Sequence, residues 1–405
     1  MDERSNLIDQ IKGLQDDLRR TRRILLSNSL IHSELRQAID SRFHNLLNKW
    51  ERRLEIALKL ANSVPDDALN TVWKDLQADR KECDAIFEEF LACLGGALIR
   101  QAQLDNGVCT IADKILADLS SRSDIPWTRM TILGEGDFFA DMTEIIRLRF
   151  PEFTIWNLPI VGHEFGHFVG RELRKRIKDR KGQRDFIKEI IEQEGKQNST
   201  EDEKKKEEDY LYEHLADIFA TYSLGPAFAF TSILLKFNPN QSQDGESHPS
   251  NVKRVYIILK TLEKMNTLPG ENQGINYQHL IRQLRESWHV SLNKLEESTI
   301  TISGLKAKRE EKTTKLLSDR LDKMYSTLMQ EVSNVRYTKE DWLRALSLSN
   351  YLCLSEQNEI NYYDYQLIDV LNAACICRWL DSKPQDDISE KAINLCHKII
   401  NEGQL

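Results

Sequence analysis

The sequence predicts a mainly α-helical chain with a small sheet, an α+β protein whose compact core is flanked by helical N- and C-terminal regions. Apolar residues recur at the three- and four-residue spacing of helices through much of the chain. Short runs typical of strands are few. Hydrophobic residues make up 40% and charged residues 30% of the 405 residues, as in globular proteins with long exposed helices. A chain of this length is expected to form two or three structural units.

Residues 1–66 are predicted to form an N-terminal helical, coiled-coil-like arm. Its apolar positions follow a helical register that breaks once and restarts, at Leu7, Ile11, Leu14, Leu18 and Leu25 and then at Leu35, Ile39, Phe43, Leu46 and Trp50. Two interpretations stay open. The helices either form a hairpin packed on their own protein, or they present an apolar stripe to a regulatory partner or to a second copy of the chain. Residues 67–126 follow as a helical connector.

Residues 127–268 are predicted to form the compact core, and residues 269–405 a C-terminal helical region. Within the core, residues 127–133 (WTRMTIL) are the best strand candidate of the chain. Residues 140–150 are predicted to form a helix that ends before Pro151, because proline disrupts a helix interior.

Two long helices are expected in the rest of the core. The first begins near Pro159, since proline is tolerated in a first helical turn, and extends to about residue 194, either continuously or with a break at Gly182. Residues 195–209 are polar and charged and lack an apolar anchor, so they are predicted to form a mobile surface loop. The second helix is expected to start near Asp209.

The composition limits the location and the partners of the chain. A net charge of −8 argues against nucleic-acid binding. The uncharged run from Ile218 to Leu235 approaches the length of a membrane span. Gly225 and Pro226 interrupt it, so we expect a buried core helix with a break and no membrane contact. The charged start lacks the apolar region of a secretory signal, and seven scattered cysteines are expected to be reduced thiols. These features predict a cytoplasmic protein.

The strongest functional signal is the stretch HEFGH at residues 163–167. Four residues turn a helix by about 400°, so His163 and His167 project from one side and their imidazoles can converge on one zinc ion. Glu164 lies about 100° round the helix from His163. From there it cannot be an in-line ligand, but it can reach a water molecule on the metal as a general base.

A catalytic zinc ion also needs a third protein ligand and an open fourth position. One class of zinc peptidases would place a histidine at position 173, but this chain has Leu173. The stretch EHLAD at residues 213–217 offers a glutamate on a later helix instead, as in thermolysin-like enzymes. Glu213 and Asp217 share one helical face, so Glu213 can bind the metal. Asp217 can then accept a hydrogen bond from the free ring nitrogen of a liganding histidine.

A third element, HPSNVKR at residues 248–254, follows the second zinc helix. His248 could donate a hydrogen bond to the oxyanion of a tetrahedral intermediate. Arg254 could orient the helix or a substrate carbonyl. The open alternative for His248 is a loop histidine that caps a helix.

In this order, HEFGH, EHLAD and HPSNVKR resemble the motifs of the gluzincin clan of zinc metallopeptidases, and within it they are most similar to the M48-type, Ste24/HtpX-like group. The resemblance covers about residues 127–265. It implies a zincin-like core in which a small sheet, whose edge strand would bind extended substrate, lies over two zinc helices. It also implies one zinc ion and these roles: ligands His163, His167 and Glu213, base Glu164, ligand partner Asp217, and oxyanion stabiliser His248 with Arg254 nearby.

The sequence therefore predicts a soluble zinc-dependent endopeptidase that cleaves a few specific protein or peptide substrates. A regulated role in a microbial stress or defence pathway fits its long helical flanks. Two alternatives stay open. A scaffold protein with a structural or vestigial zinc site would use the helical arms as its functional surface, although such a site needs no base like Glu164. A latent protease would use residues 195–209 as a plug or a cleavage loop.

Overall fold

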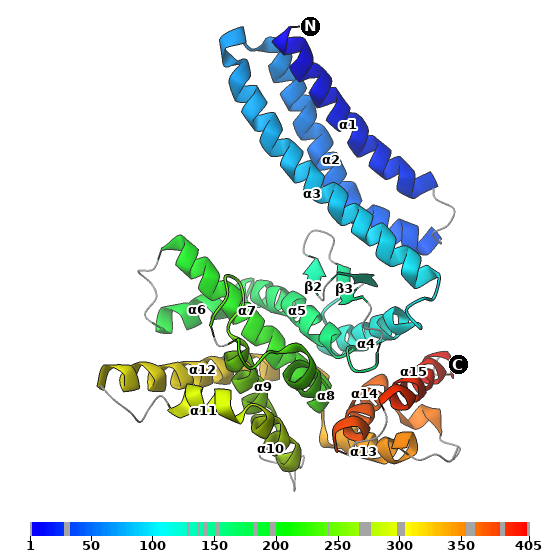
Figure 1. Ribbon diagram of the computed structural model, residues 1–405, viewed down its shortest axis with the longest axis vertical. Coiled ribbons are helices and arrows are strands. Elements are labelled where there is room, and N and C mark those ends of the chain that lie inside the picture. The colour runs from blue at the N-terminus through cyan, green and yellow to red at the C-terminus, as the bar shows by residue number, and fades with distance from the viewer. Residues whose placement is uncertain are drawn as a thin grey trace. The chain divides into compact units, whose positions relative to one another are not determined.

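The chain divides into two compact units in a computed structural model. The first unit comprises residues 1–109 and 129–151, and the second residues 110–128 and 152–405. The structure describes residues 2–27, 33–127, 130–135, 138–140, 145–150, 154–180, 185–194, 200–241, 243–266, 277–297, 304–353, 361–380 and 385–402. Most of these residues are helical, which confirms the mainly α class (Figure 1).

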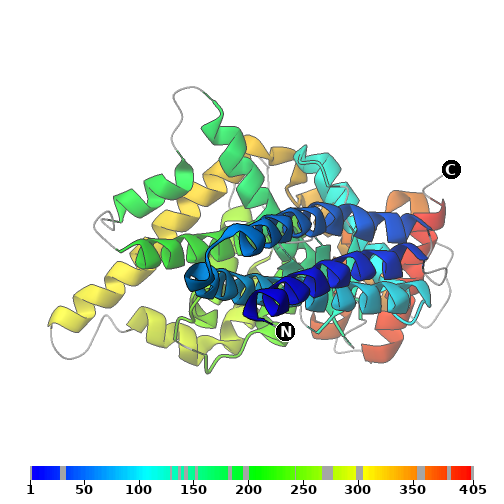
Figure 2. The same cartoon turned by 90° about the horizontal axis from the view of Figure 1, so that it is seen from above.

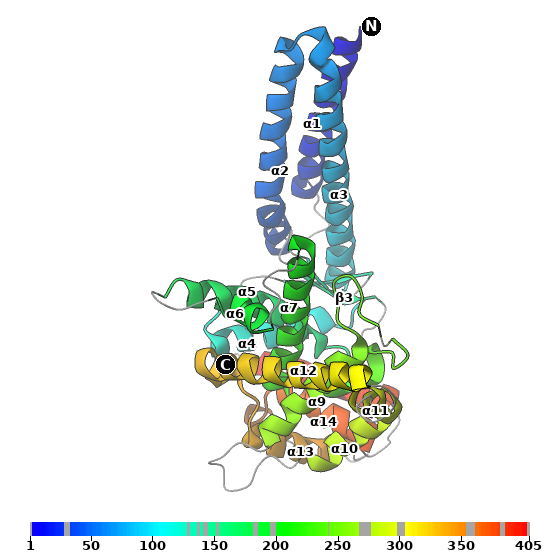
Figure 3. The ribbon, with the colours of Figure 1, turned by 90° about the vertical axis from the view of Figure 1, so that its left-hand side faces the viewer.

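Three long helices and a small sheet form the described part of the first unit. Its elements are α1 (Glu3–Ser27), α2 (Ser33–Ser63), the 3₁₀ turn η1 (Asp66–Ala68), α3 (Leu69–Gln101), β1 (Thr131–Gly134), β2 (Phe138–Ala140) and β3 (Ile145–Arg149). The helices α1, α2 and α3 run side by side in all three views (Figures 1, 2 and 3). Their shared core contains Leu7, Ile11 and Phe43 of the predicted stripe, while Leu47 is buried in place of Leu46. The first two helices thus pack on each other and on α3, as the hairpin interpretation expects.

The sheet corrects one helix prediction. Its strand order is β1-β3-β2, with β1 parallel and β2 antiparallel to the central strand β3. Residues 140–150 were expected to be helical, but Ile145–Arg149 form that central strand. Arg147, which a helix would turn toward solvent, is buried and pairs with Glu89 of α3 at 2.6 Å. Tertiary contacts therefore override the local pattern. The strand expected at residues 127–133 is present from Thr131.

The sheet is anchored to α3. Arg100 donates a hydrogen bond to the carbonyl oxygen of Thr131 at 2.7 Å, and Gly96 leaves room for the carbonyl of Leu133. The sheet therefore belongs to the first unit, whereas both predicted zinc helices belong to the second. An edge strand that binds substrate over those helices stays a prediction, as do the four predicted regions of the chain.

Every regular element in the described part of the second unit is helical. Its elements are α4 (Val108–Ser123), α5 (Ile160–Lys178), α6 (Phe186–Gln193), α7 (Glu201–Leu224), α8 (Pro226–Phe230), the π-helical turn η2 (Thr231–Lys236), α9 (Asn251–Asn266), α10 (Gln278–Ser287), α11 (His289–Glu297), α12 (Gly304–Glu331), η3 (Ser333–Val335), α13 (Lys339–Cys353), η4 (Tyr362–Asp364), α14 (Leu367–Cys375), η5 (Ile376–Leu380) and α15 (Gln385–Glu402). Helices α5 and α7 pack closely, α9 lies against α7, and α12 contacts both α7 and α9 (Figure 3).

The mobile loop predicted at residues 195–209 is wrong for residues 200–209, the part that the structure describes. Helix α7 already begins at Glu201, where Thr200 and Glu203 form a capping box. Further along, Glu207 pairs with Arg320 of α12. The charges that suggested a solvated loop thus anchor a helix, and a plug made of this segment loses its basis. Residues 195–199 lie outside the described part.

The uncharged run from Ile218 to Leu235 is a mostly buried, broken helix, as predicted. Helix α7 ends at Leu224, Gly225 takes a positive φ of 65°, and α8 starts at Pro226. Among the described residues, no helix is both long and apolar enough to span a bilayer.

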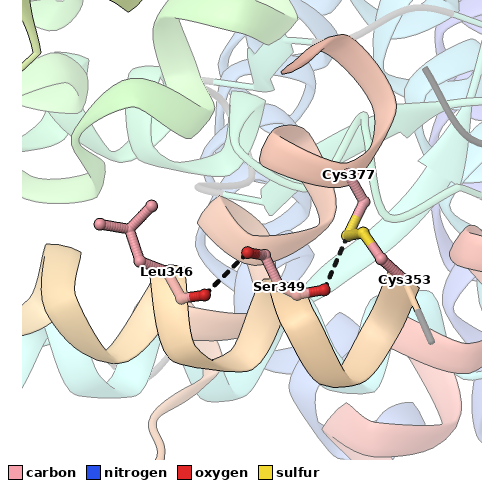
Figure 4. The surroundings of a disulfide bond; sticks show 4 residues. All are labelled: Leu346, Ser349, Cys353 and Cys377. Carbon is pink, nitrogen blue, oxygen red and sulfur yellow. Dashed lines mark hydrogen bonds between the residues drawn. A yellow bond between two sulfur atoms is a disulfide. The ribbon is translucent and has the colours of Figure 1, made fainter. Parts of the chain in front are cut away.

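The expectation of seven reduced thiols is wrong for one pair. Cys353, at the end of α13, forms a disulfide with Cys377 of η5 (Figure 4). The two cysteines are 24 residues apart, so only the packing of α13 against α14 and η5 brings them together. The remaining cysteines are buried and form no disulfide: Cys83, Cys93, Cys109, Cys375 and Cys396.

Candidate metal centre

Small residues let α5 and α7 approach closely. A Cβ atom added to Gly166 would lie only 2.8 Å from the Cα atom of Ala216. One added to Gly162 would lie 2.5 Å from Leu224 Cδ1. Because the two glycines are four residues apart, both lie on the face of α5 that meets α7. This contact brings the side chains of the two helices within reach of one another.

Three potential metal ligands converge beside this contact. The Nε2 atoms of His163 and His167 lie 3.2 Å apart. Glu213 of α7 places Oε2 3.5 Å from His163 Nε2 and Oε1 3.4 Å from His167 Nε2. His163 and Glu213 are buried, and His167 is partly exposed. The structure thus gathers all three ligands that the sequence predicted into one cluster.

Asp217 and Arg254 surround His163 from the other side. Asp217 Oδ1 lies 3.0 Å from His163 Nδ1, one helical turn after Glu213. Arg254 of α9 donates two hydrogen bonds to the Asp217 carboxylate, at 2.7 and 2.8 Å. Its Nη2 atom also lies 3.3 Å from His163 Nε2. A guanidinium cannot accept a hydrogen bond, so when the His163 ring is neutral this contact favours the tautomer with its proton on Nδ1 and a lone pair on Nε2.

The charges of the cluster favour a cation between the imidazoles. Burial lowers the pKa of His163, but its contacts with Asp217 and Glu213 outweigh burial and raise that pKa to about 10. Burial lowers the pKa of His167 to about 4, so this ring is neutral at pH 7. Burial raises the pKa of Glu213, but Arg254 and the two histidines together bring it well below its usual value. A metal requires an ionised carboxylate and neutral imidazoles. Glu213 and His167 are already in these states, whereas His163 would release a proton when a metal binds.

Glu164 is buried next to His163 on α5. Its carboxylate acts on Arg254: burial lowers the pKa of that guanidinium, whereas Asp217, Glu213 and Glu164 raise it by more. The predicted base therefore lies within electrostatic range of the residues that surround the cluster.

His248 is the exposed member of the predicted set. Its Nε2 atom lies 3.2 Å from Glu213 Oε1, and its side chain is 60% exposed. Asp244 supports the loop that carries it by accepting a hydrogen bond from the amide of Ser250 at 2.8 Å. Tyr210 of α7 donates a hydrogen bond to the Gly245 carbonyl at 2.6 Å. His248 thus lies where the cluster meets solvent. Arg254, by contrast, is buried and contacts the carboxylates of α7.

The geometry of the cluster fits a small divalent metal ion. Tetrahedral zinc, with ligand distances of about 2.0–2.2 Å, separates neighbouring ligand atoms by about 3.3–3.6 Å. The two Nε2 atoms here are 3.2 Å apart, and the closest contacts to Glu213 are 3.4 Å from His167 to Oε1 and 3.5 Å from His163 to Oε2. With one ligand atom taken from each residue, the three atoms lie within 4.8 Å of one another. In addition, the buried Oε2 atom of Glu213 accepts no hydrogen bond from the described residues. Arg254 Nη1 lies 3.2 Å from it without hydrogen-bond geometry. A shared metal ion would satisfy this oxygen and both imidazole lone pairs.

No protein-family model, curated protein or solved structure matches the chain.

Sequence reasoning missed several residues that shape the centre. Gly162 and Gly166 are visible in the sequence as small residues four apart, and that spacing could have indicated a close helix contact. Phe228 of α8 stacks on the ring of His163, with centroids 6.0 Å apart and planes 6° apart. Nothing in the sequence near Phe228 indicates this contact, which depends on the break at Gly225.

Proposed function

We propose that this chain is a zinc-dependent endopeptidase of gluzincin type. One observation carries the proposal: His163, His167 and Glu213 each place a potential ligand atom within 4.8 Å of the other two. A buried glutamate, Glu164, immediately follows the first of these ligands. A purely structural zinc site has no chemical need for a carboxylate beside a ligand, whereas hydrolysis requires a base.

The donor set favours zinc over other divalent ions. Two imidazoles and one carboxylate form the three-ligand set of catalytic zinc sites, which keep a fourth position for water or substrate. Calcium and magnesium prefer sites made entirely of oxygen atoms. A site with all four positions filled by protein would instead suggest a structural ion.

The residues of the chain would then share the chemistry of peptide hydrolysis. Zinc, when bound, supplies Lewis acidity and lowers the pKa of water toward 7. Glu164 accepts a proton from the attacking water and delivers it to the leaving amine. His248, at the exposed edge, donates a hydrogen bond to the developing oxyanion. Asp217 and Arg254 hold His163 and Glu213 in place.

The substrates that we propose are a few specific proteins or peptides. Long helices accompany the small centre, and the helices α1–α3 of the first unit offer a region for a regulatory partner or a second copy of the chain.

The test begins with zinc content. Purified wild type is expected to contain about one zinc ion per chain by elemental analysis, and Glu213→Ala much less. Glu164→Gln is the matched control because it should retain zinc but lose hydrolysis of denatured casein and of a mixed quenched-fluorescence peptide library. The proposal would be contradicted if neither wild type nor Glu213→Ala contained zinc, even after reconstitution with zinc chloride.

The same measurements separate the peptidase from a scaffold protein. A scaffold with a structural or vestigial site would bind zinc in both wild type and Glu164→Gln, and neither would cleave any substrate. Cleavage by wild type alone supports the peptidase.

A further inference from the structure

The break between α7 and α8 leaves backbone groups that need partners. Gly225 has φ 65° and ψ −146°, a region that is essentially restricted to glycine. At such a break, the last carbonyls of one helix and the first amides of the next lack partners within their own helices. Residues on both sides of the break are buried, so water cannot easily satisfy them.

Asn372 of α14 satisfies groups on both sides of the break. Its Oδ1 atom accepts a hydrogen bond from the amide of Ala227 at 2.9 Å. Its Nδ2 atom donates to the carbonyl of Leu224 at 2.9 Å and to Ile368 of its own helix at 2.9 Å. One acceptor and two donor contacts fix the orientation of the amide. Asn372 is fully buried, so it connects the end of α7 to the start of α8 within the core.

Tyr337, in the segment between η3 and α13, gives a second contact from the C-terminal region. Its amide donates a hydrogen bond to the carbonyl of Tyr222 at 2.8 Å. Its ring lies against Gly225, where an added Cβ atom would be 2.6 Å away. The C-terminal region thus supplies hydrogen-bond partners on both sides of the break and also fills the space beside its glycine.

Both sides of the break contact α5 next to a metal ligand. Leu224, the last residue of α7, packs against Gly162, which precedes His163. Phe228 of α8 stacks on the His163 ring. Asn372 binds the backbone of Leu224 and that of Ala227, the neighbour of Phe228. A change at Asn372 would therefore reach the His163 ring through two packed side chains.

We propose that Asn372 is a positioning residue for the metal centre. Through Asn372, the C-terminal helix α14 bridges the break between α7 and α8 by hydrogen bonds and so holds His163 in its ligating orientation. The proposal rests on the proposed metal site, and it gives the C-terminal helical region a role that its sequence does not suggest. A residue that orients a ligand without touching the metal typically changes metal affinity by about 10- to 100-fold.

The experiment compares zinc affinity, folded stability and amide exchange in three proteins. Asn372→Leu removes the polar contacts at similar size. Arg344→Met is the matched control, because Arg344 pairs with Asp341 of α13 and Asp369 of α14 without contacting the break. We measure zinc dissociation constants by competition with a chromophoric chelator, at a temperature where every variant is folded. Hydrogen exchange of the segment 210–230 is recorded in the absence of zinc.

The proposal expects Asn372→Leu to bind zinc about 10-fold more weakly than wild type and to exchange faster around Leu224 and Ala227. Arg344→Met should keep wild-type affinity and exchange there, even if it melts at a lower temperature. Equal affinities of Asn372→Leu and wild type would overturn the proposal, as would equal losses in both variants.

Two further outcomes are distinguishable. If Asn372→Leu does not fold, Asn372→Ala replaces it, since the smaller side chain leaves room for water and strains the core less. If wild type binds no zinc, the proposed function fails on its own. The bridging role of Asn372 is then tested by amide hydrogen exchange in α7. Unchanged protection of residues 210–224 from exchange in the Asn372 variant would overturn it.

Discussion

Asp217 accepts two hydrogen bonds from Arg254, at 2.7 and 2.8 Å, in a buried position beside His163. A bidentate guanidinium fixes both the charge and the orientation of a carboxylate. Asp217 in turn lies 3.0 Å from His163 Nδ1. The arginine therefore fixes the carboxylate that lies beside His163, a proposed metal ligand.

Arg254→Met should destabilise the protein strongly, because it leaves the Asp217 carboxylate buried without its cation. Breaking a buried ion pair typically costs about 3–5 kcal/mol. Urea denaturation would measure the loss, and zinc affinity should fall with it. The adjacent Lys253→Met is the matched control, since Lys253 forms a partly exposed pair with Asp244 worth about 0–1 kcal/mol. Equal stability of the two variants would contradict this account of Arg254.

Gly166→Ala should weaken zinc binding by separating α5 from α7. The new methyl group would meet the Cα atom of Ala216 at 2.8 Å, and backbone cannot rotate away as a side chain can. Overpacking of this kind costs about 1–3 kcal/mol, which thermal denaturation can measure beside zinc affinity. Gly95→Ala in α3 is the control, since nothing lies within 4 Å of its added Cβ. Wild-type zinc affinity in Gly166→Ala would show that the close contact does not position the ligands.

The sequence alone could predict two pairs of the candidate site residues because the spacing within each pair is local. His163 and His167, four residues apart, must share a helical face, and so must Glu213 and Asp217. The same reasoning failed where distant residues decide the structure. Ile145–Arg149 became a strand because β1 and β2 pair with it.

Distant partners also explain the other errors and omissions. The charged start of α7 is a helix because it has a local cap and because Arg320, more than 100 residues later, pairs with Glu207. The role of Asn372 depends on contacts about 145 residues away in the sequence. Single-sequence periodicity carries no information on such pairs.

Asp244 should stabilise the loop of His248 at all but the most acidic pH. Burial raises the pKa of Asp244, but Lys253 and the amide of Ser250 outweigh burial and bring it below its usual value. A carboxyl group whose folded pKa is lowered contributes stability above its unfolded pKa of about 3.9, and that contribution disappears as pH falls through the folded pKa. The free energy of unfolding of wild type should therefore exceed that of Asp244→Asn by about 1 kcal/mol at pH 7.

That difference should shrink below about pH 4, and urea denaturation of both proteins between pH 3 and pH 7 would check it. The control is Asp209→Asn, which removes a nearby carboxylate whose pKa is raised, chiefly by burial. If the difference in free energy of unfolding between wild type and Asp244→Asn stays constant with pH, the charge of the Asp244 carboxylate does not stabilise the loop.

Reduction of the Cys353–Cys377 disulfide should destabilise the C-terminal helices. The bond joins cysteines 24 residues apart. Closing such a loop lowers the conformational entropy of the unfolded chain and so stabilises the folded state by about 3 kcal/mol. Thermal denaturation with and without dithiothreitol should show a lower midpoint for reduced wild type. Cys353→Ser should melt like reduced wild type and should not respond to the reductant. If dithiothreitol lowers the midpoint of Cys353→Ser as much as that of wild type, the effect comes from another source than this bond.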